Sequence, residues 1–400
     1  MNKVRLGIIG VGNIGTTHLK NIMARKCPEI EITAVADIDP ARLDNARALV
    51  DKARAEHPEI PEIATFADAM DMISSGQIDA VLVAVPHYDH PRYSIAALKA
   101  GLHVMSEKPA GVYAEQVREV IAEADQHPDL YYALMFNLRK NSIYAKMHEI
   151  MQSGELGAIR RTNWVVTNWY RPQAYYDSGS WRATWSGEGG GVLLNQCPHN
   201  LDLWQWICGM PCKVSANLHY GKWHDIEVED DATVYVEYPN GATGVFVTST
   251  GDTPGTNRFE IVCDGGTLIC DGTSLILKKL DMPEPEFSKT NTIPFGNPKV
   301  ETINIDCGPD TGVGHPETLN AFAAAILRGE PLSADGREGI NGLTLSNAMH
   351  LSSWLGKPIE LPMDDALFKE ELMKRVKTSR RKVNVSSVLA DTDSSYNVEK

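Results

Sequence analysis

The sequence lacks the cysteine pattern of a disulfide-stabilised protein. Its 400 residues contain seven cysteines, an odd number, with no CxxC pair and no regular spacing. Small secreted domains compensate for a limited core with closely spaced disulfides, and such a framework is absent here. We therefore expect the thiols to be reduced.

The sequence also lacks an apolar run of the roughly 20 residues that a membrane-spanning helix needs. The opening residues, MNKVRLGIIGVG, are basic and then apolar, like the start of a signal peptide, but no small-residue cleavage site follows them. Glycines interrupt the apolar part, which indicates a strand and a turn instead. We expect a soluble, cytoplasmic protein with no membrane partner.

Positive charge is scarce. The 38 Lys and Arg residues are outnumbered by 52 Asp and Glu residues, which gives a formal net charge of −14. A surface of this sign repels phosphate backbones and anionic lipid headgroups at long range. We therefore expect no nucleic-acid partner.

The chain does contain enough apolar sequence for two domains, because 43% of its residues are apolar and 22% are charged. In the first third, short apolar runs alternate with stretches of helical periodicity, which predicts a parallel sheet with crossover helices. The expected strands are VRLGII, EITAVA, DAVLVAV, LHVMS and YYALMF, and the expected helices cover residues 13–25, 40–55, 88–100 and 143–151.

After about residue 160 the pattern changes to alternating strands separated by turn signals such as PNG and CDGG, which predicts an antiparallel sheet. We expect a long helix over residues 191–208 and two more over 316–327 and 339–354. The predicted organisation is a dinucleotide-binding domain (1–130), a second domain (131–362) and a polar, mixed-charge tail (363–400) that begins as a solvated helix.

Gly10, Gly12 and Gly15 have the spacing G-x-G-x-x-G, directly after an expected strand and before an expected helix. The first glycine allows a tight turn, the second lets backbone N–H groups approach a pyrophosphate, and the third lets helix and strand pack closely. Asn13 and Ile14 start the helix, whose positive dipole end meets the phosphates. We expect these five residues to bind a dinucleotide.

Asp37 ends the second strand, 22 residues after Gly15. At about this separation a carboxylate accepts hydrogen bonds from the adenosine ribose and repels a 2′-phosphate. Ile38 follows it at the same site and adds no positive charge. NAD is therefore favoured over NADP, although Arg42 is close enough to keep NADP as an alternative.

Two further strand ends carry polar side chains. Pro86, His87 and His90 follow one expected strand, and Glu107 and Lys108 follow the next. The carboxyl ends of parallel strands form the edge where such sheets build their sites. Because Lys108 precedes a proline, its backbone is confined to extended or turn geometry, so its side chain can be aimed into the cofactor cleft.

With these segments the chain resembles the glucose-fructose oxidoreductase, inositol dehydrogenase and rhizopine catabolism (Gfo/Idh/MocA) family. The resemblance covers roughly residues 3–360 and is carried by GIIGVGNIG, AVPHYDH, SEKPAG, FNLRK and GEGGGVLLNQCPHNLDLWQWICG. It implies an α/β fold with an N-terminal Rossmann dinucleotide-binding domain and a C-terminal α/β domain that has a large open, mainly antiparallel sheet. It also implies oxidation or reduction of a small-molecule carbohydrate or related carbonyl compound with a nicotinamide cofactor, in a homodimer or homotetramer.

Residue by residue, the resemblance implies that Lys108 contacts the reacting hydroxyl, that Glu107 lies near the nicotinamide ribose and that His199 belongs to the second-domain motif. Asn195 stands where many relatives have an aspartate, which is a departure from the family pattern. Because they are four residues apart on an expected helix, Asn195 and His199 would lie on one face and meet the same substrate oxygen.

Oxidation of a secondary alcohol removes the hydroxyl proton as hydride leaves the adjacent carbon. His199 titrates in a suitable range, and the neutral Asn195 supplies no carboxylate to raise the pKa of His199 or to pair with a charged lysine. We therefore expect His199 to be the general base and Lys108 to stabilise the developing alkoxide, with the reverse assignment as the alternative.

The segment WYRPQAYYDSGSWRATW has the aromatic and arginine density that suits carbohydrate. Aromatic faces stack on the C–H side of a sugar ring, and polar side chains bond its hydroxyls. Together with Lys108, Asn195 and His199, the expected substrate-binding residues are Arg171, Tyr175, Tyr176, Trp181 and Arg182.

His87 and His90 match a region of the family that lies along the cofactor, so we expect them to be cofactor-side residues. The pair also suggests a metal, but no further His, Cys or acidic residue stands at zinc-ligand spacing. We expect no metal site. Cys197, within NQCPH, is expected to be a small buried thiol rather than a nucleophile.

Together these residues predict an NAD-dependent dehydrogenase that oxidises a secondary ring hydroxyl of a sugar, cyclitol or glycoside, such as that at C3, to a ketone. One alternative is a glycoside-cleaving enzyme that retains its NAD and oxidises the ring only transiently before elimination. Another is a non-catalytic NAD-binding sensor. Net formation of NADH separates the first reading from both alternatives.

Overall fold

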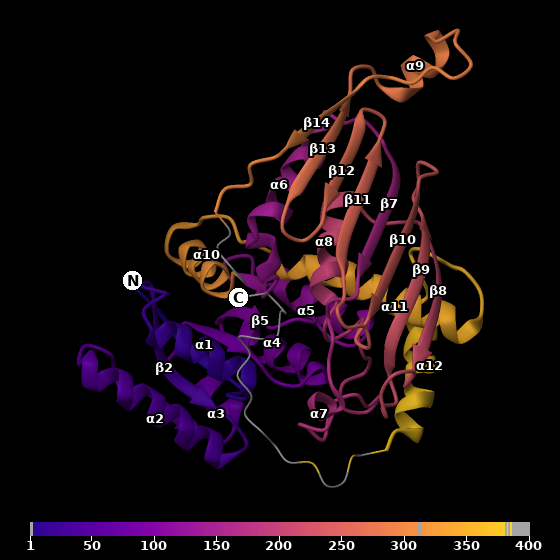
Figure 1. The fold of residues 1–400 in the computed structure, drawn as a ribbon. Coiled ribbons are helices and arrows are strands. Elements are labelled where there is room, and N and C mark those ends of the chain that lie inside the picture. Colours follow the sequence, from indigo (N-terminus) through magenta and orange to yellow (C-terminus); the bar gives the residue numbers. More distant parts are fainter. Residues whose placement is uncertain (1–2, 310–313, 381, 383–384, 386–400) are drawn as a thin grey trace.

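The protein is described by a computed structural model of residues 3–309, 314–380, 382 and 385. Its strands form one sheet of six strands and one of nine. Figure 1 shows the smaller sheet and its helices, in indigo and purple, beside the larger sheet, in magenta and orange. This arrangement confirms the predicted fold class.

The six-stranded sheet has the order β3-β2-β1-β4-β5-β6, and all its pairings are parallel. All four residues of β4 are buried, as expected for a strand that helices cover on both faces. The strand order reverses between β1 and β4, and open α/β sheets bind ligands at such a point. The strands are β1 (Val4–Ile9), β2 (Ile30–Ala36), β3 (Ala64–Phe66), β4 (Ala80–Val83), β5 (His103–Ser106) and β6 (Tyr132–Leu134).

The helices of this domain are α1 (Asn13–Met23), α2 (Pro40–Glu56), α3 (Ala69–Ser74), α4 (His90–Lys99) and α5 (Ala114–Asp125), and the one-turn η1 (His87–Asp89) precedes α4. The sequence predicted α1, α2 and α4 closely, but it missed β3, α3 and α5. For α5 a signal was present, because its buried residues Val117, Val120 and Ala124 have helical spacing.

The nine-stranded sheet has the order β14-β13-β12-β11-β7-β10-β9-β8-β15. Only the pairing of β7 with β10 is parallel among the described strands of this sheet, so the sheet is mainly antiparallel, as predicted. The strands are β7 (Ile159–Val166), β8 (Lys213–Tyr220), β9 (Glu229–Glu237), β10 (Thr243–Ser249), β11 (Asn257–Cys263), β12 (Gly266–Cys270), β13 (Leu275–Leu280), β14 (Val300–Asn304) and β15 (Ile359–Glu360).

Helices cover one face of this sheet. In Figure 1, α6 (Ser142–Ser153), α8 (Pro198–Cys208) and α11 (Gly339–Leu355) lie behind it. The indole of Trp204, on α8, stacks on the Phe246 ring of β10 with a centroid distance of 5.4 Å. The other face is open, and β9 alternates buried with exposed residues accordingly.

The prediction of one long helix over residues 191–208 was wrong, because α8 begins only at Pro198. Residues 192–197 form turns, and the N–H of Cys197 donates to the carbonyl of Val192, five residues back instead of four. Pro198 has no N–H to continue a helical ladder, but it suits the first position of a new helix. Asn195 and His199 therefore do not lie on one helical face.

The remaining elements are α7 (Gln173–Tyr176), α9 (Glu284–Thr290), α10 (His315–Arg328), α12 (Asp365–Thr378), η2 (Asn137–Lys140) and η3 (Gly336–Glu338). The helix that we expected to be solvated, α12, buries Phe368 and Leu372. The Phe368 ring stacks on Trp354 of α11 with a centroid distance of 5.5 Å. Most of the rest of the predicted tail, residues 386–400, lies outside the described residues.

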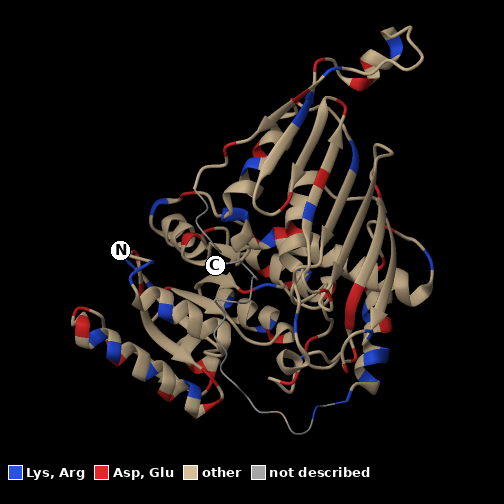
Figure 2. Ribbon diagram, viewed as in Figure 1, with Lys and Arg blue, Asp and Glu red and all other residues tan. Residues whose placement is uncertain are grey.

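Charged side chains are spread over the outside of the fold. Figure 2 shows basic and acidic residues interspersed along α2, with no large region of a single sign there. Within the described ranges, no helix has the length and apolar character to cross a membrane. All seven cysteines lie in those ranges, and each of them is a free thiol.

Candidate active site

Two glycines of the first turn, Gly10 and Gly15, stand where side chains would not fit. Gly10 has a φ of 89°, and a Cβ there would lie 2.5 Å from the carbonyl oxygen of Ala84. A Cβ on Gly15 would collide with the carbonyl oxygen of Gly10. At Gly12 the nearest atom to an added Cβ would be Nη1 of Arg42, at 3.5 Å, which is ordinary contact. The fold itself therefore does not require glycine here, whereas close approach of a pyrophosphate would.

Asp37 lies at the end of β2, beside this turn. Its carboxylate accepts hydrogen bonds from the backbone N–H groups of Val11 and Asp39, each at 2.9 Å. Nη1 of Arg42 lies 3.7 Å from Asp37, and its Nε lies 3.6 Å from Asp39. Two carboxylates therefore hold the one nearby arginine that could have bound a 2′-phosphate. Ile38 is 88% exposed and forms the outer edge of this site.

Glu107 follows β5 and is buried against two histidines. Its Oε1 lies 2.6 Å from Nε2 of His18, on α1, and the His18 ring lies edge-on to the ring of His315, 5.3 Å away. Burial is the largest single effect and would raise the pKa of Glu107, but the hydrogen bond with His18 and the positive charges of His18, His315 and Lys108 together outweigh it and lower that pKa to about 2. Glu107 is therefore a carboxylate at neutral pH.

Lys108 reaches across to the second domain. Its Nζ donates a hydrogen bond to the backbone carbonyl of Asn195, 3.0 Å away. Burial lowers the pKa of Lys108, Glu107 opposes that change, and the positive charges of Arg171 and Arg182 lower the pKa further. The ammonium group is thus held in a buried site with other cations around it.

His199 lies in the first turn of α8 and is 2% exposed. Its ring lies edge-on to that of Phe136, at a centroid distance of 6.4 Å. Burial, and then the charge of Lys108, hold the pKa of His199 well below its usual value. The imidazole is therefore neutral at neutral pH, which is the protonation state that a proton acceptor needs, and the charge of the lysine acts on it.

Two buried carboxylates fix the segment that carries His199. Asp202, on α8, accepts from the guanidinium of Arg139 at 2.7 and 2.6 Å. Glu229 accepts from the backbone N–H groups of Gly191 and Leu193, at 2.9 Å each. Arg139 belongs to the FNLRK segment, so this segment positions α8.

The side chain of Asn195 does not meet His199 through a shared helical face. Its Nδ2 donates to Glu188, and its Oδ1 accepts a hydrogen bond from the Tyr175 hydroxyl over 3.4 Å. The second oxygen of Glu188 accepts from the backbone N–H of Ala183 at 2.5 Å. Burial raises the pKa of Glu188, and the charge of Arg182 opposes that rise. Asn195 therefore links Glu188 to the segment predicted to bind substrate.

The expected substrate-binding residues come together around the ring of Tyr175. The Arg182 guanidinium donates to the Tyr175 hydroxyl at 2.8 Å and also lies over the Trp181 ring, 4.6 Å from its centroid. The guanidinium carbon of Arg171 is 5.3 Å from the Tyr175 ring centroid. Tyr176 is different, because it is only 3% exposed and its hydroxyl donates to Thr250 at 2.7 Å. Tyr176 therefore lies behind the wall that Arg171, Tyr175, Trp181 and Arg182 form, and it is not exposed to a substrate.

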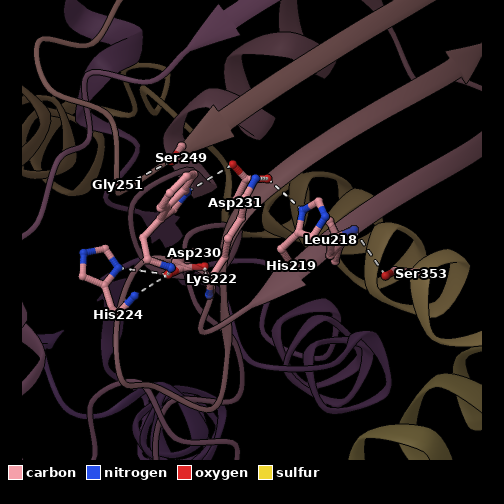
Figure 3. Close-up of polar contacts among 10 residues, drawn as sticks. Leu218, His219, Lys222, His224, Asp230, Asp231, Ser249, Gly251 and Ser353 are labelled. Carbon is pink, nitrogen blue, oxygen red and sulfur yellow. Dashed lines mark hydrogen bonds and ion pairs between the residues drawn. The ribbon is translucent and has the colours of Figure 1, made fainter.

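The loop between β8 and β9 packs against this wall through His224. Figure 3 shows the polar contacts within the loop. Asp230 accepts hydrogen bonds from the backbone N–H groups of Lys222, Trp223 and His224, at 3.0, 2.8 and 3.1 Å. The ring of His224 then packs on the ring of Tyr176 with a centroid distance of 4.9 Å. A single buried carboxylate thus orders the loop behind the substrate segment.

The C-terminal residues also contact the substrate segment. Ser379 donates to Glu227 at 2.6 Å, and Ser186 donates to Ser379 through its backbone N–H at 3.1 Å. Lys382 donates to the backbone carbonyl of Tyr176 at 2.9 Å. The chain after α12 therefore crosses the outer side of residues 176–186.

His87 and His90 occupy different places. Nδ1 of His87 lies 3.1 Å from the carbonyl oxygen of Glu188, and its ring meets Trp181 edge-on at 5.6 Å. Both ring nitrogens of His90 lie 2.7 Å from carbonyl oxygens, those of Pro109 and Val85. His90 thus holds two loops together behind the cleft, whereas His87 joins the cofactor strand end to the substrate side. Pro86 precedes His87 and leads into η1.

Sequence reasoning missed three residues that belong to this site. Glu188 stands in the GEGGG segment, where an acid beside a glycine run was a visible signal. His18 and His315, which are buried around Glu107, gave no such signal because they are distant in sequence. Among the residues that the structure describes, no group of three or more His, Cys, Asp or Glu side chains could hold a metal ion. Cys197 is buried, and burial raises its pKa to about 12.

The N-terminal domain, residues 4–134, matches the oxidoreductase family with an NAD-binding Rossmann fold (GFO/IDH/MocA), and residues 144–269 match the GFO/IDH/MocA C-terminal domain. The uncharacterized oxidoreductase YrbE of Bacillus subtilis is 24% identical over 89% of this chain and 96% of its own length. The myo-inositol 2-dehydrogenase of Thermotoga maritima is 26% identical over 67% of this chain and 75% of its own length.

Solved structures of similar proteins contain nicotinamide cofactors and carbohydrates. The WlbA dehydrogenase from Chromobacterium violaceum, in complex with NADH and UDP-GlcNAcA, has a TM-score of 0.74 at 29% identity and covers 91% of this chain and 97% of its own. Levoglucosan dehydrogenase, in complex with NADH and levoglucosan, shares the fold with a TM-score of 0.71 at 19% identity, over 90% of this chain and all of its own.

These matches confirm the predicted family and cofactor. The tight glycine turn and the fixed carboxylate of Asp37 fit a dinucleotide with a free 2′-hydroxyl. The protein binds NAD through its Rossmann domain. The chain belongs to the GFO/IDH/MocA family of oxidoreductases, which includes dehydrogenases of sugars and cyclitols.

Proposed function

We propose that this protein is an NAD-dependent dehydrogenase that oxidises a secondary ring hydroxyl, such as that at C3, of a sugar, cyclitol or glycoside to a ketone. The observation that carries the proposal is that Lys108, which follows β5, reaches the segment of the second domain that leads into His199. Lys108 donates to the backbone of Asn195, four residues before His199, and its charge lowers the pKa of His199.

The cofactor site supplies one half of the reaction. NAD, when bound, accepts the hydride from the reacting carbon. Gly10, Gly12 and Gly15 allow the backbone and α1 to approach its phosphates, with Asn13 and Ile14 at the start of the helix. Asp37 would accept hydrogen bonds from the adenosine ribose, and Glu107 would lie near the nicotinamide ribose.

Lys108 and His199 supply the other half. The ammonium group of Lys108 donates to the reacting oxygen and stabilises negative charge as it develops there. The neutral imidazole of His199 accepts the hydroxyl proton. The resulting imidazolium would carry a charge in a site that already lowers the pKa of His199, so the proton is returned readily to water after the reaction.

The substrate segment binds the remainder of the ring. The faces of Tyr175 and Trp181 suit the C–H side of a sugar, and Arg171, Arg182 and Asn195 provide polar contacts. The relatives that act on or bind myo-inositol, levoglucosan and UDP-GlcNAcA support a ring polyol as the class of substrate. The screen described next identifies the polyol and the ring position that is oxidised.

The test is a screen of free sugars, inositols, anhydrosugars, glycosides and UDP-linked sugars with NAD and with NADP. We expect net NADH from at least one ring polyol, a ketone identified in the product by NMR, and weaker turnover with NADP. Lys108→Ala abolishes this activity, whereas Lys146→Ala, on the exposed side of α6, keeps it. Release of an aglycone without net NADH, or no turnover with any polyol, would overturn the proposal.

We also propose that the open face of the nine-stranded sheet joins copies of the chain into a homodimer or homotetramer. On this face Tyr235 is 42% exposed and lies between exposed and half-buried neighbours of β9. Analytical ultracentrifugation tests this point, with Tyr235→Lys expected to shift the assembly toward monomer. A wild-type monomer at micromolar concentration contradicts it.

A further inference from the structure

Glu188 is a buried carboxyl group whose two oxygens hold two different parts of the site. It is 2% exposed. One oxygen accepts a hydrogen bond from Nδ2 of Asn195, and the other accepts from the backbone N–H of Ala183 at 2.5 Å. A single side chain therefore joins the chain that precedes α8 to the chain that carries Arg182.

The backbone of Ala183 has a conformation that needs support. Its φ is 55°, in the left-handed region that residues with a side chain rarely adopt, and the residue is fully buried. Its N–H donates to Glu188, and its carbonyl oxygen accepts from the N–H of Glu227 at 3.2 Å. Because Arg182 directly precedes Ala183, this turn sets the direction from which the Arg182 side chain enters the site.

The contacts that start at Glu188 close into a ring. The Tyr175 hydroxyl donates to Oδ1 of Asn195 over 3.4 Å, and the same hydroxyl accepts from the Arg182 guanidinium at 2.8 Å. Arg182 is followed by Ala183, whose N–H returns to Glu188. Two of the proposed substrate contacts, Arg182 and Asn195, are thus held in one network with Glu188.

The same network reaches the reacting lysine and the cofactor domain. The backbone carbonyl of Asn195 accepts from Nζ of Lys108 at 3.0 Å. Nδ1 of His87, which follows β4, lies 3.1 Å from the carbonyl oxygen of Glu188. Glu188 therefore contacts the cofactor domain through its backbone and the substrate side of the second domain through its side chain.

We propose that Glu188 is the positioning residue of the substrate site: as the acceptor of two hydrogen bonds, it aligns Arg182 and Asn195 with each other and so sets where the substrate lies relative to Lys108. This role rests on the proposed dehydrogenase function and deepens it, because it names a residue that determines the fit of the substrate. Glu188 acts through Arg182 and Asn195 and needs no contact with the substrate itself.

The experiment exchanges the functional groups of residues 188 and 195. Glutamine has the shape of glutamate but only one acceptor oxygen, so in Glu188→Gln either Ala183 or Asn195 loses its hydrogen bond. When Glu188→Gln is combined with Asn195→Asp, the amide of residue 188 can donate to the carboxylate of residue 195 while its oxygen still accepts from Ala183. The double variant therefore restores both contacts.

The readouts are kcat and KM for the best substrate of the screen, each at the pH optimum, and the Kd for NAD. Glu188→Gln should lower kcat/KM by roughly ten- to hundredfold and leave the Kd for NAD within about twofold of the wild type. The double variant should return kcat/KM to within about fivefold of the wild type.

The same substitution thus harms the wild type and improves Asn195→Asp. A role limited to stability would lower the melting temperature of Glu188→Gln without this reversal in the kinetics. Glu149→Gln, at an exposed position on α6, is the matched control and should leave kcat, KM and Kd unchanged.

The inference is overturned if Glu188→Gln folds and keeps kcat/KM within about twofold of the wild type, or if the double variant is no better than Asn195→Asp alone. The second comparison decides the question even if Glu188→Gln by itself does not fold. Either outcome in an active enzyme refutes only the role of Glu188. A wild type without turnover on any polyol refutes the dehydrogenase proposal and this role with it.

Discussion

The ammonium group of Lys108 donates a hydrogen bond to the backbone carbonyl of Asn195, 3.0 Å away. Lys108 follows β5 of the NAD-binding domain, and Asn195 precedes α8 of the second domain. A backbone carbonyl is present whatever the side chain, so this contact does not depend on which side chain residue 195 carries. The side chain of Asn195 acts on the site by another route, through Glu188 and Tyr175.

Asn195→Asp places a second carboxyl group beside Glu188. Negative charge at this position favours the protonated forms of nearby bases, so the pKa of His199 should rise. A base with a higher pKa loses its proton at a higher pH, and the acid limb of the profile of kcat/KM against pH should move up by about one unit. An unmoved profile shows that residue 195 is not coupled to the acid–base group. Asn217→Asp, on β8, is the matched control.

Asp37→Asn removes the charge that faces the adenosine ribose but keeps an oxygen for the N–H of Val11. We expect the Kd for NAD to rise about tenfold, since a charge-assisted hydrogen bond is lost. The Kd for NADP should fall, because Arg42 loses one of its two carboxylate neighbours and can bind a 2′-phosphate. Fluorescence titration with both cofactors measures this, with the exposed Asp44→Asn as control. Equal changes for NAD and NADP would contradict the assignment.

Much of the NAD-binding half could be predicted from the sequence because its signals are local. The glycine spacing and Asp37 lie within one strand, turn and helix, and the apolar runs of β1 and β4 are continuous. The predicted start of α8 was wrong because helical periodicity continues back through residues 191–197, whereas the helix itself begins at Pro198. The signal for the true start was Pro198 itself, because proline has no backbone N–H and favours the first position of a helix.

The buried group around Glu107 was not predictable in the same way. His18, Glu107 and His315 come from α1, the end of β5 and α10, and only the packing of α10 against α1 brings them together. The role of Glu188 has a similar origin, because it depends on the path of the chain from residue 183 to residue 195. Residues joined only by tertiary contacts carry no common sequence signal.

His315 should make the protein sensitive to mild acid. Burial, and then the charge of His18, lower the pKa of His315 to about 3. The unfolded chain, with a histidine pKa near 6.5, binds a proton that the native state does not, so the free energy of unfolding falls as pH drops below about 6.5. Between pH 6.5 and 5, the free energy of unfolding of His315→Gln should therefore decrease by about 2 kcal/mol less than that of the wild type.

Urea unfolding followed by tryptophan fluorescence at the two pH values measures this difference. The control is His57→Gln, since the His57 side chain is 40% exposed. Parallel losses of stability in the wild type and in His315→Gln would show that His315 is not the group that titrates.

A chain that ends at Thr378 loses the contacts of Ser379 with Glu227 and of Lys382 with Tyr176. Each of these two part-buried hydrogen bonds stabilises by about 1 kcal/mol, so KM for the polyol should rise by up to about thirtyfold while the Kd for NAD stays constant. A chain ending at Val385 keeps both contacts and serves as control. If the shorter chain has the KM of the longer one, the C-terminal residues do not order the substrate segment.

The measurement that tests the central claim most directly is the turnover of His199→Ala on the polyol that the screen identifies. If His199 accepts the hydroxyl proton, kcat falls by about two to four powers of ten, while the Kd for NAD stays within about twofold of the wild type. His127→Ala, a histidine at the end of α5, should leave both unchanged. A His199→Ala enzyme whose kcat stays within a few-fold of the wild type would contradict the account.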